Sequence, residues 1–302
     1  MHANLLIRDA TKIAEMRERV YGYMLYTRRE KYEGWIRGIK RYKKWVLAAE
    51  RWLVPLGVEY FRDAALRLEM IECVYAALRC KDDIADGDAP LPARFCSRTA
   101  YAEAMMHFVR TGRKHHELSE ELLAHAFDVA KELDMHIKPF VLDMLESLLF
   151  DAVRSESPEL VIFDQEQLDR SSGLLDIIGT GGGGLLALGE PLTALDTIEP
   201  LGQANRIAYN IRDLDEDMRS NQCNISREDI ETFGILDPRD THSPEVRRWK
   251  CKEAARGLLL LEKYRWSVPT AGLHPITRII FWLVYDRPTE RSLERALTEN
   301  LD

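Results

Sequence analysis

Helical periodicity runs through almost the whole chain and limits it to an all-α fold. Residues 140–153 read FVLDMLESLLFDAV, with apolar residues at intervals of three and four and acidic residues between them. This is the pattern of an amphipathic helix. The same pattern recurs over residues 58–80, 101–109, 118–136, 201–219, 245–266 and 276–284. Strand-like alternation bounded by turn residues is scarce, so the sequence predicts about ten helices and no substantial sheet.

Helix breakers separate these runs without forming a linker between domains. The breakers fall at residues 87–92, 155–158, 179–191 and 237–244, where Gly, Pro and Ser interrupt the helical pattern. There is no internal repeat and no long stretch rich in Gly, Ser or Pro. We therefore expect an N-terminal helical extension over residues 1–44 and a single main domain over residues 45–302, large enough to enclose a ligand cavity.

Charge and cysteine content exclude several classes of protein. The 302 residues carry 42 Lys and Arg against 50 Asp and Glu, a formal charge of −8, which argues against a general nucleic-acid binder. The five cysteines show neither CxxC nor Cys/His ligand spacing, which predicts a reduced, cytoplasmic environment. No run reaches the roughly 18 apolar residues of a membrane span. We expect a soluble protein, or at most a peripheral one.

One region is basic. Positions 28–45 hold eight Lys and Arg residues together with four aromatic residues. One interpretation is an interfacial helix that makes a peripheral membrane contact with anionic lipid, or a flap over an anionic ligand. The other is a solvated helix face whose aromatic residues pack on the body of the protein. Glu30 and Glu33 dilute the positive charge and favour the second interpretation.

The first of two acidic clusters lies at residues 79–88, with the sequence RCKDDIADGD. On a helix, Asp82 and Asp86 are four residues apart, so their Cβ atoms lie roughly 5–6 Å from each other. Two like charges at that distance repel, and Mg²⁺, which prefers hard oxygen ligands, would give them a common partner. Arg79 and Lys81 lie beside them, as expected for a diphosphate that accepts charge-assisted hydrogen bonds.

The second acidic cluster lies at residues 209–221, with the sequence YNIRDLDEDMRSN. On one helix, Asp213, Asp217 and Asn221 would form a stripe of oxygen ligands. Asn210 is an alternative to Asn221, and the adjacent cations are Arg212 and Arg219.

Either cluster alone is more typical of an exposed acidic helix face, paired with local arginine, than of a metal site. Two such clusters, each next to an apolar helix, favour a pocket for a Mg²⁺ cluster and a diphosphate. Metal ions that hold a diphosphate stabilise it as a leaving group, which promotes C–O ionisation of an allylic diphosphate. An apolar cavity would protect the resulting carbocation from water.

These motifs resemble the squalene/phytoene synthase family of head-to-head isoprenyl diphosphate synthases. Residues 75–86 resemble the first DxxxD helix of that family, including the arginine three residues before the first aspartate. Residues 201–217 resemble the second such helix, and residues 177–182 resemble a family helix break. Asp151 matches an acidic position on an intervening helix. The likeness extends over about residues 45–290 in the same order.

The resemblance implies an isoprenoid synthase-like helical bundle around a central apolar cavity, with two or three Mg²⁺ ions and an isoprenyl diphosphate substrate. The implied catalytic metal ligands are Asp82, Asp86, Asp213 and Asp217, with Asn221 or Asn210 as additional ligands. The resemblance implies Arg79 as a diphosphate contact. The other substrate contacts that we expect are Lys81, Arg212, Arg219 and Tyr209. Asp83 is a weaker candidate, because it points about 100° of helix away from the first pair.

The chain also departs from the family pattern. Arg206 and Tyr209 stand where the family has Gln-x-x-Asn, and residues 220–224 replace Arg-Gly-Arg-x-Tyr with Ser-Asn-Gln-Cys-Asn. These losses affect residues that handle the second diphosphate in head-to-head coupling.

Three hypotheses follow. The first is a head-to-head prenyl transferase, the second a terpene synthase that acts as a lyase on one diphosphate, and the third a non-catalytic lipid-binding or assembly factor. Retention of four aspartates at metal spacing counts against the third. The altered flank of the second motif favours the lyase, whereas the family resemblance favours the transferase, which we place first.

Overall fold

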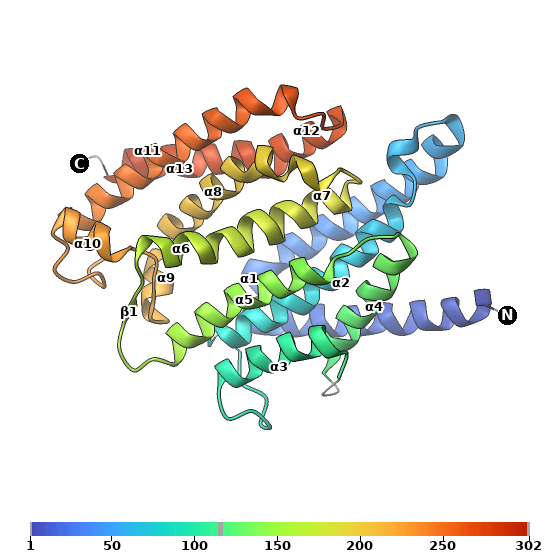
Figure 1. Ribbon diagram of the computed structural model, residues 1–302, viewed down its shortest axis with the longest axis horizontal. Coiled ribbons are helices and arrows are strands. Elements are labelled where there is room, and N and C mark those ends of the chain that lie inside the picture. Colours follow the sequence, from blue (N-terminus) through green and yellow to red (C-terminus); the bar gives the residue numbers. More distant parts are fainter. Residues whose placement is uncertain (1, 88, 114–116, 301–302) are drawn as a thin grey trace. The chain divides into compact units, whose positions relative to one another are not determined.

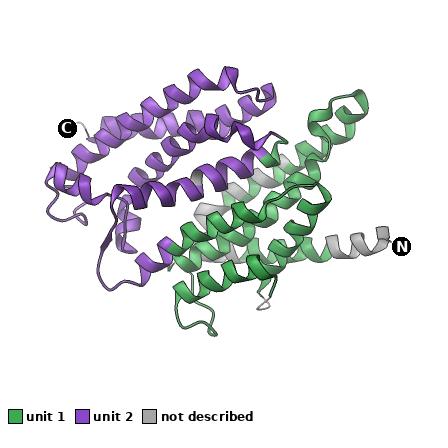
Figure 2. Ribbon diagram, in the orientation of Figure 1, with its two compact units in different colours: residues 1–149, 186–189 green, residues 150–185, 190–302 purple. Residues whose placement is uncertain are grey.

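The computed structural model describes residues 2–87, 89–113 and 117–300. Side chains are not described for residues 2–10, for residue 176 and for several positions between 23 and 42. The chain divides into two compact units (Figure 2). The first unit comprises residues up to Leu149 with Leu186–Gly189, and the second comprises Phe150–Leu185 with residues from Glu190 onward. The boundary predicted between residues 44 and 45 lies within a helix and stays a prediction.

The predicted all-α class is confirmed, because 79 % of the described chain is helical and the strands are two residues long (Figure 1). Before residue 157 the elements are α1 (His2–Leu53), η1 (Val54–Leu56), η2 (Glu59–Phe61), α2 (Ala64–Ala85), α3 (Arg98–Thr111), α4 (Leu118–Glu132) and α5 (Lys138–Glu156). The middle of the chain contains β1 (Val161–Ile162), α6 (Gln165–Ser172), η3 (Gly173–Gly182), α7 (Gly183–Ala187), η4 (Leu192–Ala194), α8 (Leu195–Arg212), α9 (Leu214–Arg219) and β2 (Gln222–Cys223). The chain continues with α10 (Arg227–Phe233), α11 (Pro244–Ser267), η5 (Val268–Thr270), α12 (Pro275–Phe281), η6 (Trp282–Asp286) and α13 (Arg287–Asn300).

Helix α2 is the central helix of the first unit. Met70, Cys73, Ala76 and Ala77 have no exposed surface, and α2 packs on both α1 and α4. A helix that is apolar on most of its surface is stable only where other helices cover it. This packing fixes the C-terminal end of α2, where the first acidic cluster lies.

Helix α1 doubles back on itself. Lys40 lies 2.8 Å from Glu18, and Arg17 and Lys43 both contact Glu69. In a straight helix, residues 17 and 43 would lie roughly 39 Å apart. The two arms of α1 therefore run antiparallel in the first unit, as Figure 1 shows.

The basic region at residues 28–45 falls on the second arm of α1. The side chains of Arg28, Arg29, Lys31, Tyr32, Trp35 and Tyr42 lie outside the described residues. Of the others, Trp45 packs edge-on against Phe61, with ring centroids 5.7 Å apart, and Lys43 binds carboxylates of α2. These contacts favour packing on the body, and a peripheral membrane contact stays a prediction. No helix in the described ranges is both long and apolar enough to cross a membrane.

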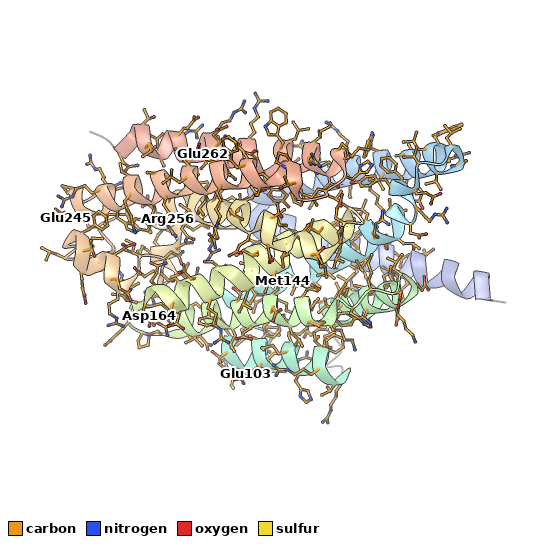
Figure 3. The ribbon with its side chains drawn as sticks, turned by 45° about the horizontal axis from the view of Figure 1, so that its top comes forward. Glu103, Met144, Asp164, Glu245, Arg256 and Glu262 are labelled. Atoms are coloured by element: carbon orange, nitrogen blue, oxygen red, sulfur yellow. The ribbon has the colours of Figure 1, made fainter. Side chains whose placement is uncertain are left out.

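In the second unit, α8 packs between η3 and the pair formed by α11 and α13 (Figure 1). Gly257 permits close approach within that pair, because a Cβ atom there would lie 2.8 Å from Leu293 of α13. Asp164, labelled in Figure 3, lies at the start of α6. It caps the helix by accepting a hydrogen bond from the backbone N–H of Gln167 at 2.8 Å.

The glycine-rich segment differs from the expected helix break. Residues Gly173–Gly182 form a π-helical stretch that continues into α7, and the helix ends only at Ala187. The chain then turns at Gly189, whose φ is 72°. Gly184 lies next to Phe281, because a Cβ atom at this position would be in ordinary van der Waals contact with the ring, at 3.7 Å. The segment therefore continues the helix as a wider π-helical stretch instead of ending it.

Candidate functional site

The first acidic cluster forms at the C-terminal end of α2, in the first unit. Asp86 caps the helix, and its backbone N–H donates to the Asp82 carbonyl at 2.8 Å. The two residues thus share one helical turn, and their carboxylate oxygens lie within 4.8 Å of each other. Both side chains are half-buried. The predicted spacing of the first carboxylate pair is therefore present.

Arg79 lies on the same turns and neutralises part of this charge. Its guanidinium group forms an ion pair with Asp82, and a second nitrogen lies 3.6 Å from Asp83 Oδ1. Asp83 is fully buried, which agrees with its expected direction away from the first pair. Arg79 is thus next to the carboxylates, in the place where a diphosphate contact was predicted.

Lys81 occupies a different environment. Its side chain is 2 % exposed, and its ammonium group lies 3.9 Å from the centroid of the Tyr101 ring on α3. Burial lowers the pKa of Lys81 to about 8. The amine therefore packs against an aromatic ring, and its predicted contact with substrate stays a prediction.

The second acidic cluster begins at the junction of α8 and α9, in the second unit. Asp213 ends α8 and accepts two hydrogen bonds from Arg212, at 2.8 and 2.6 Å. The Arg212 guanidinium also lies 4.5 Å from the centroid of the Tyr209 ring. The hydrogen bonds that Arg212 donates to Asp213 raise the pKa of Arg212. Arg219 instead donates to the Asp215 carbonyl at 3.0 Å.

Asp217 is held by residues that the sequence motifs did not identify. Asn224 donates to its Oδ2 atom at 2.7 Å, and Arg154 donates to Asn224 Oδ1 at 3.0 Å. Arg154, which is buried, also donates to Asp151 and to the Cys223 carbonyl. The parallel pairing of β1 with β2 places Cys223 opposite Ile162 and so fixes the approach of Asn224. The only signal in the sequence was the match of Asp151 to an acidic family position.

Burial raises the pKa of Asp217 to about 7, and the nearby Asp213 carboxylate adds to the increase. Arg206 and Arg154 act in the opposite direction but do not overcome it. The carboxylate is thus an unfavourable anion in the metal-free protein. A hard divalent cation would stabilise it, and the donor set of carboxylate oxygens is the one that Mg²⁺ prefers.

The expected stripe of Asp213, Asp217 and Asn221 on one helix does not form. Helix α9 ends at Arg219, and Asn221 lies in a turn with a φ of 60°. Its side chain donates to the Ser157 carbonyl at 3.0 Å and accepts from Arg239 at 2.9 Å. The periodicity argument was wrong beyond Arg219, because the chain leaves the helix to pair as β2. Metal ligation by Asn221 or by Asn210, which lies on α8, stays a prediction.

A small apolar pocket lies beside α8 in the second unit. Its cavity volume is about 20 Å³, which is room for roughly one water molecule. The lining residues are Thr180, Gly181, Ile198, Leu201, Gly202, Asn205, Phe281 and Tyr285. The pocket as it stands is too small for an isoprenyl chain.

Comparison with known proteins identifies the fold. No protein-family model matches the chain, and no curated protein sequence matches it. Solved structures do match. One is squalene synthase HpnC from Alicyclobacillus acidocaldarius, with 18 % identity over 86 % of this chain and 96 % of that chain, and a TM-score of 0.60. Another is a dehydrosqualene synthase in complex with ligand, with 15 % identity over 86 % of this chain and 85 % of that chain, and a TM-score of 0.50.

The chain is therefore an all-α protein with the isoprenoid synthase fold. Within that fold, the structures it resembles are those of a squalene synthase and a dehydrosqualene synthase. The fold implied by the sequence resemblance is confirmed. At these identities the likeness defines the fold, and the reaction has to be argued from the residues.

Proposed function

We propose that this chain is an enzyme of isoprenoid biosynthesis that ionises an allylic isoprenyl diphosphate in a Mg²⁺-dependent reaction. The observation that carries the proposal is the presence of two carboxylate pairs at four-residue spacing, Asp82 with Asp86 and Asp213 with Asp217, in a chain with the isoprenoid synthase fold. The proposal requires the two pairs to act on one substrate.

The four aspartates would hold a cluster of two or three Mg²⁺ ions. The raised pKa of Asp217 supports this assignment, because a carboxylate that burial destabilises as an anion gains most from a neighbouring cation. When bound, the metal supplies positive charge that stabilises the departing diphosphate.

The arginines beside each pair would orient the substrate. Arg79 holds Asp82, and Arg212 holds Asp213. Diphosphate oxygens accept the same charge-assisted hydrogen bonds as carboxylate oxygens. Each guanidinium group can therefore exchange one acceptor for the other when substrate binds, with little loss of hydrogen bonding. Apolar helix surfaces would exclude water from the prenyl chain and from the cation that forms on it.

The leading reaction is head-to-head condensation of two isoprenyl diphosphates, as in squalene and phytoene synthases. The second candidate is a terpene synthase that converts one diphosphate into a terpene and so acts as a carbon–oxygen lyase. One observation favours the second candidate. Residues 220–224 form a turn and strand β2 and supply Asn224 to Asp217, instead of cations for a second diphosphate.

Product analysis separates the two reactions. Purified protein is incubated with C10, C15 and C20 isoprenyl diphosphates, with and without Mg²⁺ and NADPH, and the hydrocarbons are identified by mass spectrometry. A product of doubled carbon number supports the transferase, and a terpene of unchanged carbon number supports the lyase. Absence of diphosphate release with every substrate would refute both.

A further inference from the structure

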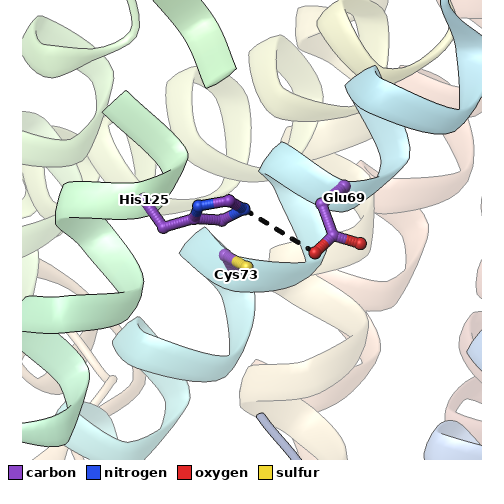
Figure 4. Close-up of side chains that lie close together, drawn as sticks. All are labelled: Glu69, Cys73 and His125. Carbon is purple, nitrogen blue, oxygen red and sulfur yellow. Dashed lines mark ion pairs between the residues drawn. The ribbon is translucent and has the colours of Figure 1, made fainter. Parts of the chain in front are cut away.

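A second cluster of metal-binding side chains lies in the first unit, away from the aspartates. Glu69 and Cys73 are four residues apart on α2, and His125 reaches them from α4 (Figure 4). Along α2, Glu69 is 13 residues before Asp82, which corresponds to roughly 20 Å. This cluster is therefore separate from the first acidic cluster.

The ligand atoms are already close to the positions that a bound ion requires. Glu69 Oε1 lies 3.7 Å from His125 Nε2, and these atoms and the Cys73 sulfur all lie within 4.8 Å of one another. With metal–ligand distances near 2.1 Å for nitrogen and oxygen and 2.3 Å for sulfur, a tetrahedral site needs ligand separations of roughly 3.4–3.6 Å. The ligand atoms would have to move closer by at most about 1.4 Å, and by only about 0.3 Å for the Glu69–His125 pair.

The two oxygens of Glu69 have different partners, and this difference orients the carboxylate. Oε2 accepts from Arg17 at 3.1 Å and from Lys43 at 2.7 Å, whereas Oε1 faces His125. Outer hydrogen bonds of this kind fix the direction of a metal-ligating carboxylate.

Neighbouring Glu72 does not compete for the same role. It accepts hydrogen bonds from the Tyr21 hydroxyl at 2.6 Å and from Lys43 at 2.8 Å, and it forms an ion pair with Arg17 at 3.1 Å. These three partners all lie on α1. The negative charges of Glu69 and Glu72 balance the positive charges of Arg17 and Lys43. A divalent ion bound with a Cys73 thiolate would therefore leave this group of residues with a single positive charge.

We propose that Glu69, Cys73 and His125 form a binding site for a divalent transition metal of the Zn²⁺ class. One sulfur, one nitrogen and one oxygen donor suit Zn²⁺ and Co²⁺, whereas Mg²⁺ prefers oxygen alone. Three protein ligands leave the fourth position for water. Glu69 and His125 side chains are each 22 % exposed, so an ion can enter from solvent. The bound ion would join α4 to the central helix α2.

Cobalt spectroscopy tests the proposal without reference to the proposed enzymatic activity. The full chain is titrated with Co²⁺ in the presence of saturating Mg²⁺, so that the aspartate pairs are occupied. We expect one equivalent of Co²⁺ to produce a thiolate-to-cobalt charge-transfer absorption in the near ultraviolet. Zn²⁺ should displace it. Cobalt binding without this absorption would overturn the proposal.

Two variants and a control identify the ligands. Cys73→Ser should abolish the charge-transfer absorption, whereas Cys251→Ser, on α11 of the second unit, should retain it. His125→Gln keeps the thiol and should weaken Co²⁺ binding at least about tenfold. Circular dichroism establishes that each variant is folded. An unchanged absorption in Cys73→Ser, or unchanged affinity in a folded His125→Gln protein, would contradict the assignment.

Discussion

Substitution of Asp217 by Asn should stabilise the metal-free protein, which is an unusual result for a residue assigned to an active site. Asp217 has a pKa of about 7 in the folded chain, against an ordinary value of 3.8. At 1.36 kcal/mol per pKa unit, this difference corresponds to about 4 kcal/mol. An amide oxygen at this position can still accept the hydrogen bond from Asn224, so the substitution removes the charge and keeps the contact.

The sign of the pH dependence follows from proton binding. Between about pH 4 and about pH 7 the unfolded chain has lost the Asp217 proton and the folded chain keeps it, so the free energy of unfolding falls as pH rises. The loss is complete above about pH 7. Urea denaturation without Mg²⁺ should therefore give equal stabilities for wild type and Asp217→Asn near pH 4, and a more stable variant near pH 8.

Asp215→Asn is the matched control on the same helix. Asp215 is exposed, and a hydrogen bond from Thr241 lowers its pKa. Its removal should not stabilise the protein near pH 8. Saturating Mg²⁺ should raise the stability of the wild type and leave Asp217→Asn little changed. If Asp217→Asn is no more stable than wild type near pH 8 without Mg²⁺, the assigned environment of Asp217 is wrong.

Three further substitutions test the packing around the two clusters by urea denaturation. Asn224→Ala leaves Arg154 without one of its acceptors and should lower the free energy of unfolding by about 1–3 kcal/mol. The control Asn300→Ala, near the C-terminal end of α13, should lower it much less. Equal losses of stability in the two variants would contradict the buried network. Gly257→Ala forces the buried Leu293 side chain to shift within a filled core and should cost about 1–3 kcal/mol. Gly22→Ala, which meets open space, should not be destabilising; the reverse order would refute the close approach. Lys81→Met should stabilise the protein near pH 7 by up to about 3 kcal/mol, because the charged amine is buried in the wild type. This gain should shrink as pH rises above about 8, where the amine loses its charge. A destabilised variant would mean that the contact with Tyr101 outweighs the cost of burial.

The features that the sequence predicted correctly depend on local spacing. The apolar period predicts α2, and a four-residue interval places Asp82 and Asp86 on one turn whatever packs around the helix. Arg79 reaches Asp82 for the same reason. The all-α class follows from the same periodicity, repeated along the chain.

The features that it missed depend on contacts between distant residues. Arg154 lies 70 residues before Asn224, so the network that holds Asp217 has no local signature. Asn221 lies beyond the end of α9, because residues 222 and 223 pair with β1 and draw the chain out of the helix. The four-residue spacing of Glu69 and Cys73 is visible in the sequence, but His125 joins them only through the packing of α4 on α2.

The doubled-back path of α1 belongs to the same category. The helix extends from His2 to Leu53, and periodicity gives no indication that it reverses. The reversal becomes evident from ion pairs such as that between Lys40 and Glu18. Long-range ion pairs of this kind have no one-dimensional pattern.

Diphosphate release from isoprenyl diphosphates tests the central claim most directly. Wild-type protein should release diphosphate only when Mg²⁺ is present, Asp82→Asn and Asp213→Asn should each reduce the rate by at least about a hundredfold, and Asp215→Asn should be near wild type. All variants should keep the wild-type circular dichroism spectrum. Wild-type release that is independent of Mg²⁺, or near-normal release by either Asp82→Asn or Asp213→Asn, would contradict the assignment of the two aspartate pairs.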